Sequence, residues 1–460
     1  MSLIKSISGF RGTIGGKPGD NLTPIDAVKF AAAYGTWLKN QSKKESYKVV
    51  IGRDARISGQ MISQLVCSTL QGLGINVIDL DLSTTPTVEV MVTHLNADGG
   101  IILTASHNPK EWNALKLLNA KGEFVSAQDG AEILATVDAD NYIFADVDNL
   151  GTYETFDGAI DLHIEKILQL PLVNVEAIKA KKFKVAIDAV NSTGGISIPN
   201  LLDKLGVEYI KMHCEPTGHF PHNPEPLKEH LGDICTKVIE EKADFGIVVD
   251  PDVDRLALID EKGNMFGEEY TLVAVADYVL GKTPSATVSN LSSSRALRDI
   301  TEKYEQTYSP SAVGEVNVVI EMKEIGALIG GEGNGGIIYP ELHYGRDSLV
   351  GIALFLSHLA ELNTTVSELR ASYPAYFMAK KKIELTPEIN VDELLIKVQE
   401  LYKDEQINTV DGVKIDFANE WVHLRKSNTE PIIRIYTEST TEENANLLAD
   451  KMIESIQSII

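Results

Sequence analysis

Ser106 and His107 stand side by side in the stretch ILTASHNPKEWNALKLL, and Lys116 follows within the same stretch. A serine in a loop after an apolar run is a candidate nucleophile, a candidate carrier of a transferred group, or only a polar turn residue. No Asp/His arrangement typical of a hydrolase triad accompanies it. The other motifs of the chain must therefore decide between these interpretations.

Three aspartates, Asp250, Asp252 and Asp254, lie close together in GIVVDPDVDRLALID. Such carboxylates repel one another unless a cation neutralises them, and oxygen ligands without His or Cys favour Mg²⁺ over Ca²⁺ or Mn²⁺. An EF-hand competes, because Glu261 falls at its twelfth position, but Arg255 stands where that loop requires glycine and strands are expected on both sides. An acidic surface loop is the other alternative, and the apolar flanks argue against it. We expect a magnesium site.

A set of hydrogen-bond donors precedes an apolar strand in WVHLRKSNTEPIIRI, namely Arg425, Ser427, Asn428 and Thr429. An arginine with hydroxyls, an amide and backbone N–H groups suits a cluster of phosphate oxygens. A hairpin turn of turn-forming residues fits the same letters. Taken alone, this stretch leaves both interpretations open.

Glycines surround Glu332 and Asn334 in IGGEGNGGIIYPELHYGRDS. This is not a dinucleotide-binding fingerprint, because a strand instead of a helix is expected after the glycines. One carboxylate and one amide in such a loop can hydrogen-bond sugar hydroxyls, and a tight turn between strands is the alternative.

Two arginines lie in short polar stretches near the N-terminus. Arg11 stands in SGFRGTIGG, and Arg53 precedes Asp54 in IGRDARISG. Either guanidinium can contact an anion. Considered one at a time, both are expected to be ordinary surface charges.

The elements that must position these residues alternate between apolar strands and helical patterns. YKVVIGRD, SGQMISQLVCSTLQGLG and INVIDLD read as strand, helix and strand, and the same order returns twice further on, which predicts three α/β domains with parallel sheets. After about Ala371 the pattern alternates with period two, with Asp411-Gly412 as a turn and a closing helical run, which predicts an antiparallel α+β domain. The expected domains are 1–153, 154–254, 255–370 and 371–460.

Length and composition limit the class of protein. The 460 residues exceed one compact core, and the formal net charge of −24 argues against a nucleic-acid partner. The start MSLIKSISGFRG shows no signal-peptide pattern, no apolar run is long enough to span a membrane, and the three cysteines form no C-x-x-C pair. We expect a cytoplasmic protein with reduced thiols and no membrane partner.

Taken together and in this order, the four motifs resemble those of the α-D-phosphohexomutases, a family of phosphoglucomutases, phosphomannomutases and phosphoglucosamine mutases. The resemblance covers essentially the whole chain through the T-A-S-H-N-P, D-x-D-x-D-R, G-E-x-x-G and R-x-S-N-T-x-P loops. It implies four domains around a central cleft: three related α/β domains with mixed, mainly parallel sheets and a C-terminal α+β domain that acts as a mobile lid.

The resemblance also implies which residues act. Ser106 matches a serine that is phosphorylated in the resting enzyme, and with Asp250, Asp252 and Asp254 it would hold one Mg²⁺. Lys116 is similar to a proposed acid/base group. Two further catalytic residues are then expected, Arg11 and His107. The expected substrate-binding residues are Arg255, Glu332, Asn334, Arg425, Ser427, Asn428 and Thr429.

The implied reaction interconverts the 6-phosphate and 1-phosphate of a hexose through a hexose 1,6-bisphosphate. Lys116 would move the proton if burial and nearby cations lower its pKa. The G-E-G-N-G-G loop is similar to that of proteins assigned as phosphoglucosamine mutases, so glucosamine phosphates are expected, with glucose or mannose phosphates as the alternative. A metal-dependent serine phosphatase and a sugar-phosphate sensor are the alternatives from other classes. A monomer or a homodimer is expected.

Two departures from the family pattern stand out. Gly336 replaces the histidine that many members carry in G-E-M-S-G-H, for which His343 in ELHYGRD is a candidate substitute. The serine-rich NLSSSRAL, residues 290–297, lacks a lysine found there in some relatives.

Overall fold

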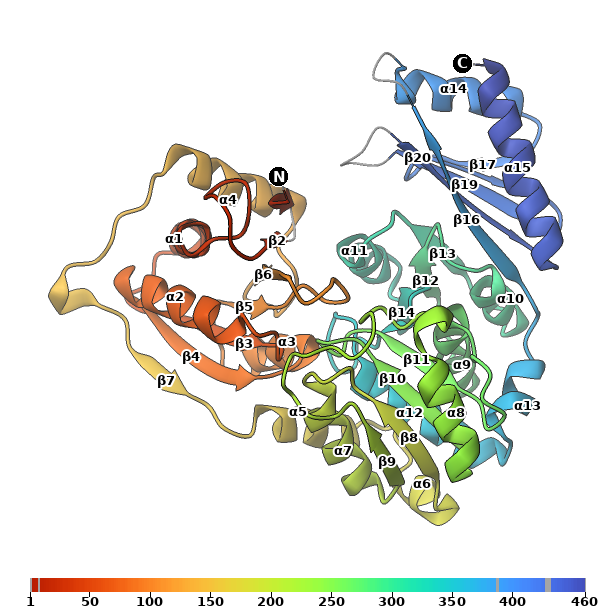
Figure 1. The fold of residues 1–460 in the computed structure, drawn as a ribbon, viewed down its shortest axis with the longest axis horizontal. Coiled ribbons are helices and arrows are strands. Elements are labelled where there is room, and N and C mark those ends of the chain that lie inside the picture. The colour runs from red at the N-terminus through yellow and green to blue at the C-terminus, as the bar shows by residue number, and fades with distance from the viewer. Residues whose placement is uncertain (1, 7–8, 386–388, 427–431, 460) are drawn as a thin grey trace. The chain divides into compact units, whose positions relative to one another are not determined.

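The computed structural model describes residues 2–6, 9–385, 389–426 and 432–459. The chain forms two compact units, one of residues 1–271 and 334–367 and the other of residues 272–333 and 368–460. Four sheets organise them (Figure 1). Within these described ranges, no helix combines the length and the apolar character needed to cross a bilayer.

The first sheet has the strand order β1-β2-β6-β5-β3-β4-β7. β3, β4, β5 and β7 pair in parallel, and β5, β6, β2 and β1 pair antiparallel. The strands are β1 (Ile4–Ser6), β2 (Gly9–Thr13), β3 (Tyr47–Arg53), β4 (Ile75–Leu82), β5 (Gly99–Leu103), β6 (Trp112–Leu118) and β7 (Tyr153–Thr155). The helices are α1 (Pro24–Gln41), α2 (Gly59–Gly72), α3 (Thr85–His94), α4 (Ala127–Ala139) and α5 (Ala159–Leu168).

Helices cover both faces of this sheet. Successive strand residues point to opposite sides, so apolar residues next to each other on a strand pack into different cores. Val49 and Ile51 of β3 belong to the core formed with α1, α2 and α4, whereas Val50 belongs to the core formed with α3 and α5. Each fully buried aliphatic side chain of this kind contributes roughly 1.5–3 kcal/mol. The sheet is therefore a rigid support for the loops at its strand ends.

The second sheet has the order β11-β10-β8-β9, with β8, β9 and β10 parallel and β11 antiparallel to β10. Its strands are β8 (Lys184–Asp188), β9 (Glu208–Met212), β10 (Phe245–Val249) and β11 (Leu256–Ile259). The helices of this part are α6 (Val175–Lys181), α7 (Gly194–Leu205), α8 (Gly232–Glu241) and α12 (Ser348–Leu362). The loop that carries Asp250, Asp252 and Asp254, here called the aspartate loop, joins β10 to β11.

The third sheet contains β12 (Thr287–Asn290) with β13 (Tyr308–Ser311) and β14 (Ile329–Glu332) as its parallel partners. Its helices are α10 (Ala296–Lys303) and α11 (Glu315–Ile325). Other elements of this stretch of the chain are α9 (Glu268–Lys282), β15 (Gly336–Ile338) and α13 (Val366–Ala371).

The C-terminal sheet is antiparallel throughout, with the order β16-β20-β19-β18-β17. Its strands are β16 (Phe377–Glu384), β17 (Gln406–Asn408), β18 (Val413–Asp416), β19 (Trp421–Lys426) and β20 (Ile432–Ser439), and α14 (Val391–Leu401) and α15 (Glu442–Ile459) share a core with it. Gly412, with φ of 71°, turns the chain between β17 and β18 as the sequence predicts. The expected fold class is confirmed: mixed α/β sheets are followed by an antiparallel α+β part.

Candidate active site

Ser106 lies in the loop between β5 and β6, in a left-handed backbone conformation with φ of 48°. A residue with a side chain is uncommon there and needs support from its surroundings. Its N–H donates to Thr104 Oγ1 at 2.9 Å, and Thr104 Oγ1 donates to Asp54 Oδ2 at 2.7 Å. The loop is thus fastened to the end of β3.

Arg56 holds the same loop from within the protein. Its side chain is buried and pairs with Asp54 at 3.0 Å. Its other guanidinium nitrogens donate to four backbone carbonyls at 2.6–2.8 Å, those of Ser106, Asn108 and Pro109 in the loop and that of Trp112 at the start of β6. A fixed fork of donors is what permits one side chain to satisfy so many carbonyls. Neither Asp54 nor Arg56 was identified from the sequence as a site residue.

The aspartate loop brings three buried carboxylates to the serine. Asp250, Asp252 and Asp254 are fully buried, and one oxygen from each lies within 4.8 Å of the others. Ser106 Oγ donates to Asp250 Oδ2 at 2.7 Å. Thr85 Oγ1 donates to Asp252 Oδ2 at 2.6 Å. The flanking elements β10 and β11 are strands, which excludes an EF-hand.

The loop fits a hard divalent cation. Oδ1 of Asp252 and Oδ1 of Asp254 are buried, and neither accepts a hydrogen bond from any residue that the structure describes. Burial, and then the charges of Asp252 and Asp254, raise the pKa of Asp250 well above its ordinary value, against the opposing effects of Arg255 and Ser106. Orphaned carboxylate oxygens and mutual repulsion are both relieved by a cation such as Mg²⁺.

Lys116 on β6 bridges two of these carboxylates. Its Nζ lies 2.7 Å from Asp252 Oδ2 and 3.4 Å from Asp254 Oδ2. Burial lowers the pKa of Lys116, but Asp252 and Asp254 raise it by more, so the net direction is upward. The condition set for proton transfer by Lys116, a pKa lowered by burial and nearby cations, is therefore not met in the metal-free site, because two carboxylates face the ammonium.

His107 is held in its neutral form. Its Nδ1 lies 3.3 Å from Ser106 Oγ. Burial, and then the positive charge of Arg255, lower the pKa of His107 to about 3. The imidazole is therefore uncharged at neutral pH and can accept or donate one hydrogen bond at the serine.

The two other arginines expected at the site in this unit, Arg255 and Arg11, lie on different elements: Arg255 at the end of the aspartate loop and Arg11 on β2. The backbone N–H of Arg255 donates to Asp250 Oδ1 at 3.2 Å, and its guanidinium lies 3.5 Å from Glu225. Arg11 is exposed on β2, where it pairs with Ala114 of β6. Because Ala114 and Lys116 lie two residues apart on one strand, Arg11 and Lys116 point to the same face of the sheet.

In the other unit, Glu332 ends β14 and accepts two hydrogen bonds through Oε1. Asn290 Nδ2 donates at 2.9 Å and the Gly314 N–H at 3.2 Å. The neighbouring Val313 N–H donates to Asp411 Oδ2 at 3.0 Å, and the same Asp411 oxygen lies 2.8 Å from Arg425 Nε. The short backbone segment of Val313 and Gly314 therefore connects the carboxylate of Glu332, through Asp411, to Arg425.

Asn334 Oδ1 accepts the Gly336 N–H at 3.2 Å. Ser427, Asn428 and Thr429 lie outside the described residues.

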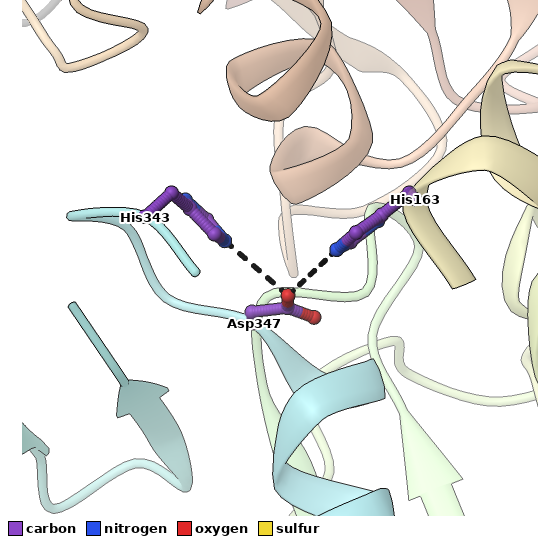
Figure 2. Close-up of side chains that lie close together, drawn as sticks. All are labelled: His163, His343 and Asp347. Carbon is purple, nitrogen blue, oxygen red and sulfur yellow. Dashed lines mark hydrogen bonds and ion pairs between the residues drawn. The ribbon is translucent and has the colours of Figure 1, made fainter. Parts of the chain in front are cut away.

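His343, the candidate substitute for the histidine that many relatives carry at the position of Gly336, contacts Glu89 and Asp347. Its Nδ1 lies 3.1 Å from Glu89, and its Nε2 lies 3.2 Å from Asp347 Oδ2. His163 Nε2 contacts the same Asp347 oxygen at 2.9 Å, so both rings converge on one carboxylate (Figure 2). The residue of this segment that does reach the aspartate loop is Arg346, whose guanidinium lies 2.7 Å from Asp254 Oδ2. The sequence pattern did not single out Arg346.

Comparison with known proteins identifies the chain. Four domain profiles described as phosphoglucomutase/phosphomannomutase match in order, domain I at residues 3–143, domain II at 161–263, domain III at 267–376 and the C-terminal domain at 381–455. The chain belongs to this family. It is thus an α-D-phosphohexomutase, an enzyme of the isomerase class.

Relatives of this phosphohexomutase match it along almost their full length. A phosphoglucomutase/phosphomannomutase of Thermococcus kodakarensis is 36% identical over 94% of this chain and 95% of its own. A phosphoglucosamine/phosphogalactosamine mutase of Sulfurisphaera tokodaii is 31% identical over 99% and 100%. A phosphoglucomutase/phosphomannomutase family protein of Burkholderia thailandensis shares the fold with a TM-score of 0.86, at 23% identity over 99% and 97% of the two chains.

Proposed function

We propose that this phosphohexomutase interconverts glucosamine 6-phosphate and glucosamine 1-phosphate by way of a phosphorylated Ser106. The observation that carries the proposal is the 2.7 Å contact between Ser106 Oγ and Asp250 Oδ2. It puts the hydroxyl of the loop at a buried cluster of carboxylates that suits a divalent cation. A phosphoryl group on this serine would lie beside that cation, the arrangement that phosphoryl transfer requires.

Asp250, Asp252 and Asp254, with the phosphate on Ser106, would hold one Mg²⁺, which supplies charge neutralisation for the transferring group. The free hydroxyl of the sugar phosphate forms a bond to phosphorus while the bond from phosphorus to Ser106 Oγ breaks. The product is a hexose 1,6-bisphosphate. After this intermediate turns round, Ser106 Oγ attacks its other phosphate, and the isomeric monophosphate leaves.

Lys116 is the proposed carrier of the hydroxyl proton. Its Nζ is fixed by Asp252 and Asp254, which favour the ammonium form. A cation held by the same carboxylates would offset their negative charge and so lower this pKa, and the amine could then exchange a proton with the substrate. Neutral His107 is proposed to support the serine loop, and Arg255 and Arg11 to contact phosphate.

Arg425, with Ser427, Asn428 and Thr429, is proposed to bind the phosphate that does not react. Glu332 is proposed to accept hydrogen bonds from two neighbouring sugar hydroxyls, which occupy similar places in both orientations of the intermediate. The chain of contacts from Glu332 through the 313–314 backbone and Asp411 to Arg425 supports a common location for sugar and phosphate recognition.

The choice of sugar rests on relatives. The names phosphoglucosamine/phosphogalactosamine mutase, in Sulfurisphaera tokodaii, and probable phosphoglucosamine mutase, in Methanopyrus kandleri, favour glucosamine phosphates. A distant structural relative from Aspergillus fumigatus, at 14% identity and a TM-score of 0.56, is described in complex with GlcNAc-6P and magnesium. The name of the Thermococcus kodakarensis relative favours glucose and mannose phosphates as the second candidate.

The test is a side-by-side assay with glucosamine, glucose and mannose 1-phosphates in the presence of Mg²⁺. The proposal predicts the highest kcat/KM for glucosamine 1-phosphate, with no activity in Ser106→Ala. If glucose or mannose 1-phosphate gives the highest kcat/KM instead, that sugar phosphate is the substrate and the proposed glucosamine specificity is wrong. If inorganic phosphate is released at the rate at which the substrate is lost, the protein hydrolyses the sugar phosphate as a phosphatase and the proposed mutase reaction is wrong.

A further inference from the structure

Arg346 reaches a carboxylate of the aspartate loop from a distant part of the chain. Its guanidinium lies 2.7 Å from Asp254 Oδ2, and its side chain is about 10% exposed. Asp254 Oδ2 also faces Lys116, whereas Asp254 Oδ1 accepts no hydrogen bond from the described residues. One oxygen of the carboxylate is therefore held by two cations while the other is left for a metal ion.

The side chain of Arg346 also occupies the space over Gly336. A Cβ atom on Gly336 would overlap Arg346 Cδ and lie 3.0 Å from its Cγ and 3.1 Å from Asn334 Oδ1. The backbone of Gly336 is not in the left-handed region, so a side chain is excluded by packing and not by φ. Gly336 is the position at which many members of the family carry histidine. The arginine and the glycine thus form a matched pair.

The segment that carries Arg346 is fixed on three sides. Asp347 Oδ1 caps α12 by accepting the Leu349 N–H at 2.8 Å, and its Oδ2 faces His163 of α5 and His343 (Figure 2). A Cβ on Gly345 would overlap the carboxylate of Glu89 on α3. Because the backbone on both sides of Arg346 is fixed in this way, its side chain can hold the carboxylate of Asp254, which is far away along the chain, in one orientation.

We propose that Arg346 is a positioning residue of the phosphoryl-transfer site: it fixes Asp254 with Oδ1 directed at the metal, and it takes the space that Gly336 leaves open. This inference rests on the proposed function of the aspartate loop. It assigns the role to a residue outside the four sequence motifs, and it explains why a side chain is absent at Gly336.

The packing half of the inference is tested by thermal unfolding of the metal-free protein. Gly336→His is expected to lower the Tm by about 3 °C or more, because the added side chain overlaps Arg346. In the Arg346→Ala background the same change is expected to have less than about half this effect. Equal losses in both backgrounds would show that the two side chains do not compete for one space.

The catalytic half is tested by steady-state kinetics. Arg346→Met is expected to lower kcat about 10²-fold with KM changed less than about threefold, because a displaced carboxylate misplaces the reacting groups. Arg346→Lys is expected to recover at least about tenfold of this loss, and Arg298→Met, which removes an ion-paired arginine of α10, is the control. If Arg346→Met keeps kcat within about threefold of an active parent, the inference is wrong. An inactive parent would instead contradict the proposed function, and the Tm comparison would still test the packing.

Discussion

Ser106 Oγ lies 2.7 Å from Asp250 Oδ2, although 144 residues separate the two along the chain. The serine is buried in a loop of the first sheet, and the carboxylate is buried at the end of β10 in the second. The proposed phosphoryl group on this hydroxyl would lie beside the carboxylates that would hold the cation. This contact joins the serine and the aspartates in one site, which the stretch around Ser106 did not reveal by itself.

Repulsion within the aspartate loop predicts a conflict between stability and function. Asp250→Asn should raise the free energy of unfolding of the metal-free protein, because it removes a carboxyl group whose ionisation is disfavoured by burial and by two neighbouring carboxylates, which raise its pKa. Since the folded pKa of Asp250 lies above its ordinary value, the stability of the parent should fall as the pH rises above that ordinary value of about 3.9, and more steeply than that of the variant. Thermal unfolding in EDTA and in Mg²⁺ measures both effects. A lower Tm of the variant in EDTA would contradict the account.

Arg56 is predicted to be essential for the shape of the serine loop. Arg56→Met leaves Asp54 buried without its partner, which typically costs about 3–5 kcal/mol. Asp54→Asn in the same chain should recover part of that loss but not the phosphoryl transfer, because the four backbone carbonyls lose the guanidinium that holds them together. Denaturant unfolding and activity of the single and double variants separate the two effects. Full activity of Arg56→Met would exclude this role.

The His163, His343 and Asp347 cluster predicts a loss of stability at alkaline pH. Asp347 and Glu89 overcome the effect of burial and raise the pKa of His343 to about 10. A histidine whose folded pKa is raised contributes stability fully below its ordinary pKa of about 6.5, and this stability is lost as pH rises toward 10. The free energy of unfolding should therefore fall between pH 7 and 10, and less steeply in His343→Gln. The exposed His94→Gln is the control, and equal slopes in parent and His343→Gln would contradict the prediction.

Glu332 is predicted to serve both directions of the reaction. Glu332→Ala should lower kcat/KM about 10²-fold from either sugar monophosphate, because the hydrogen bonds to two hydroxyls are lost in both orientations. Glu332→Gln, which keeps one acceptor, should lose less. Initial rates measured from each end provide the comparison. Unchanged turnover in both directions would remove Glu332 from the site.

The elements and the acidic loop followed from the sequence because each is a local pattern. Apolar runs predicted β3, β10 and β11, and the period-two alternation predicted the antiparallel sheet. The spacing of Asp250, Asp252 and Asp254 carried its own electrostatic argument. These features depend on neighbours along the chain.

Arg56 and Arg346 could not be predicted in the same way. Both are arginines in unremarkable polar stretches, and their importance comes from contacts with loops far along the chain. The raised pKa of Lys116 could not be predicted for the same reason, because the direction in which a pKa shifts depends on which charged groups lie next to the side chain in the fold. Burial of a charged side chain and its partners are properties of the tertiary structure.

The mass of the intact protein tests the central claim most directly. After incubation with a hexose 1,6-bisphosphate and Mg²⁺, the parent should gain the mass of one phosphoryl group, located by peptide mapping on Ser106, and should lose it on addition of excess sugar monophosphate. Ser106→Ala should gain none. A parent that is active but carries no phosphoryl group on Ser106 under either condition would contradict the account.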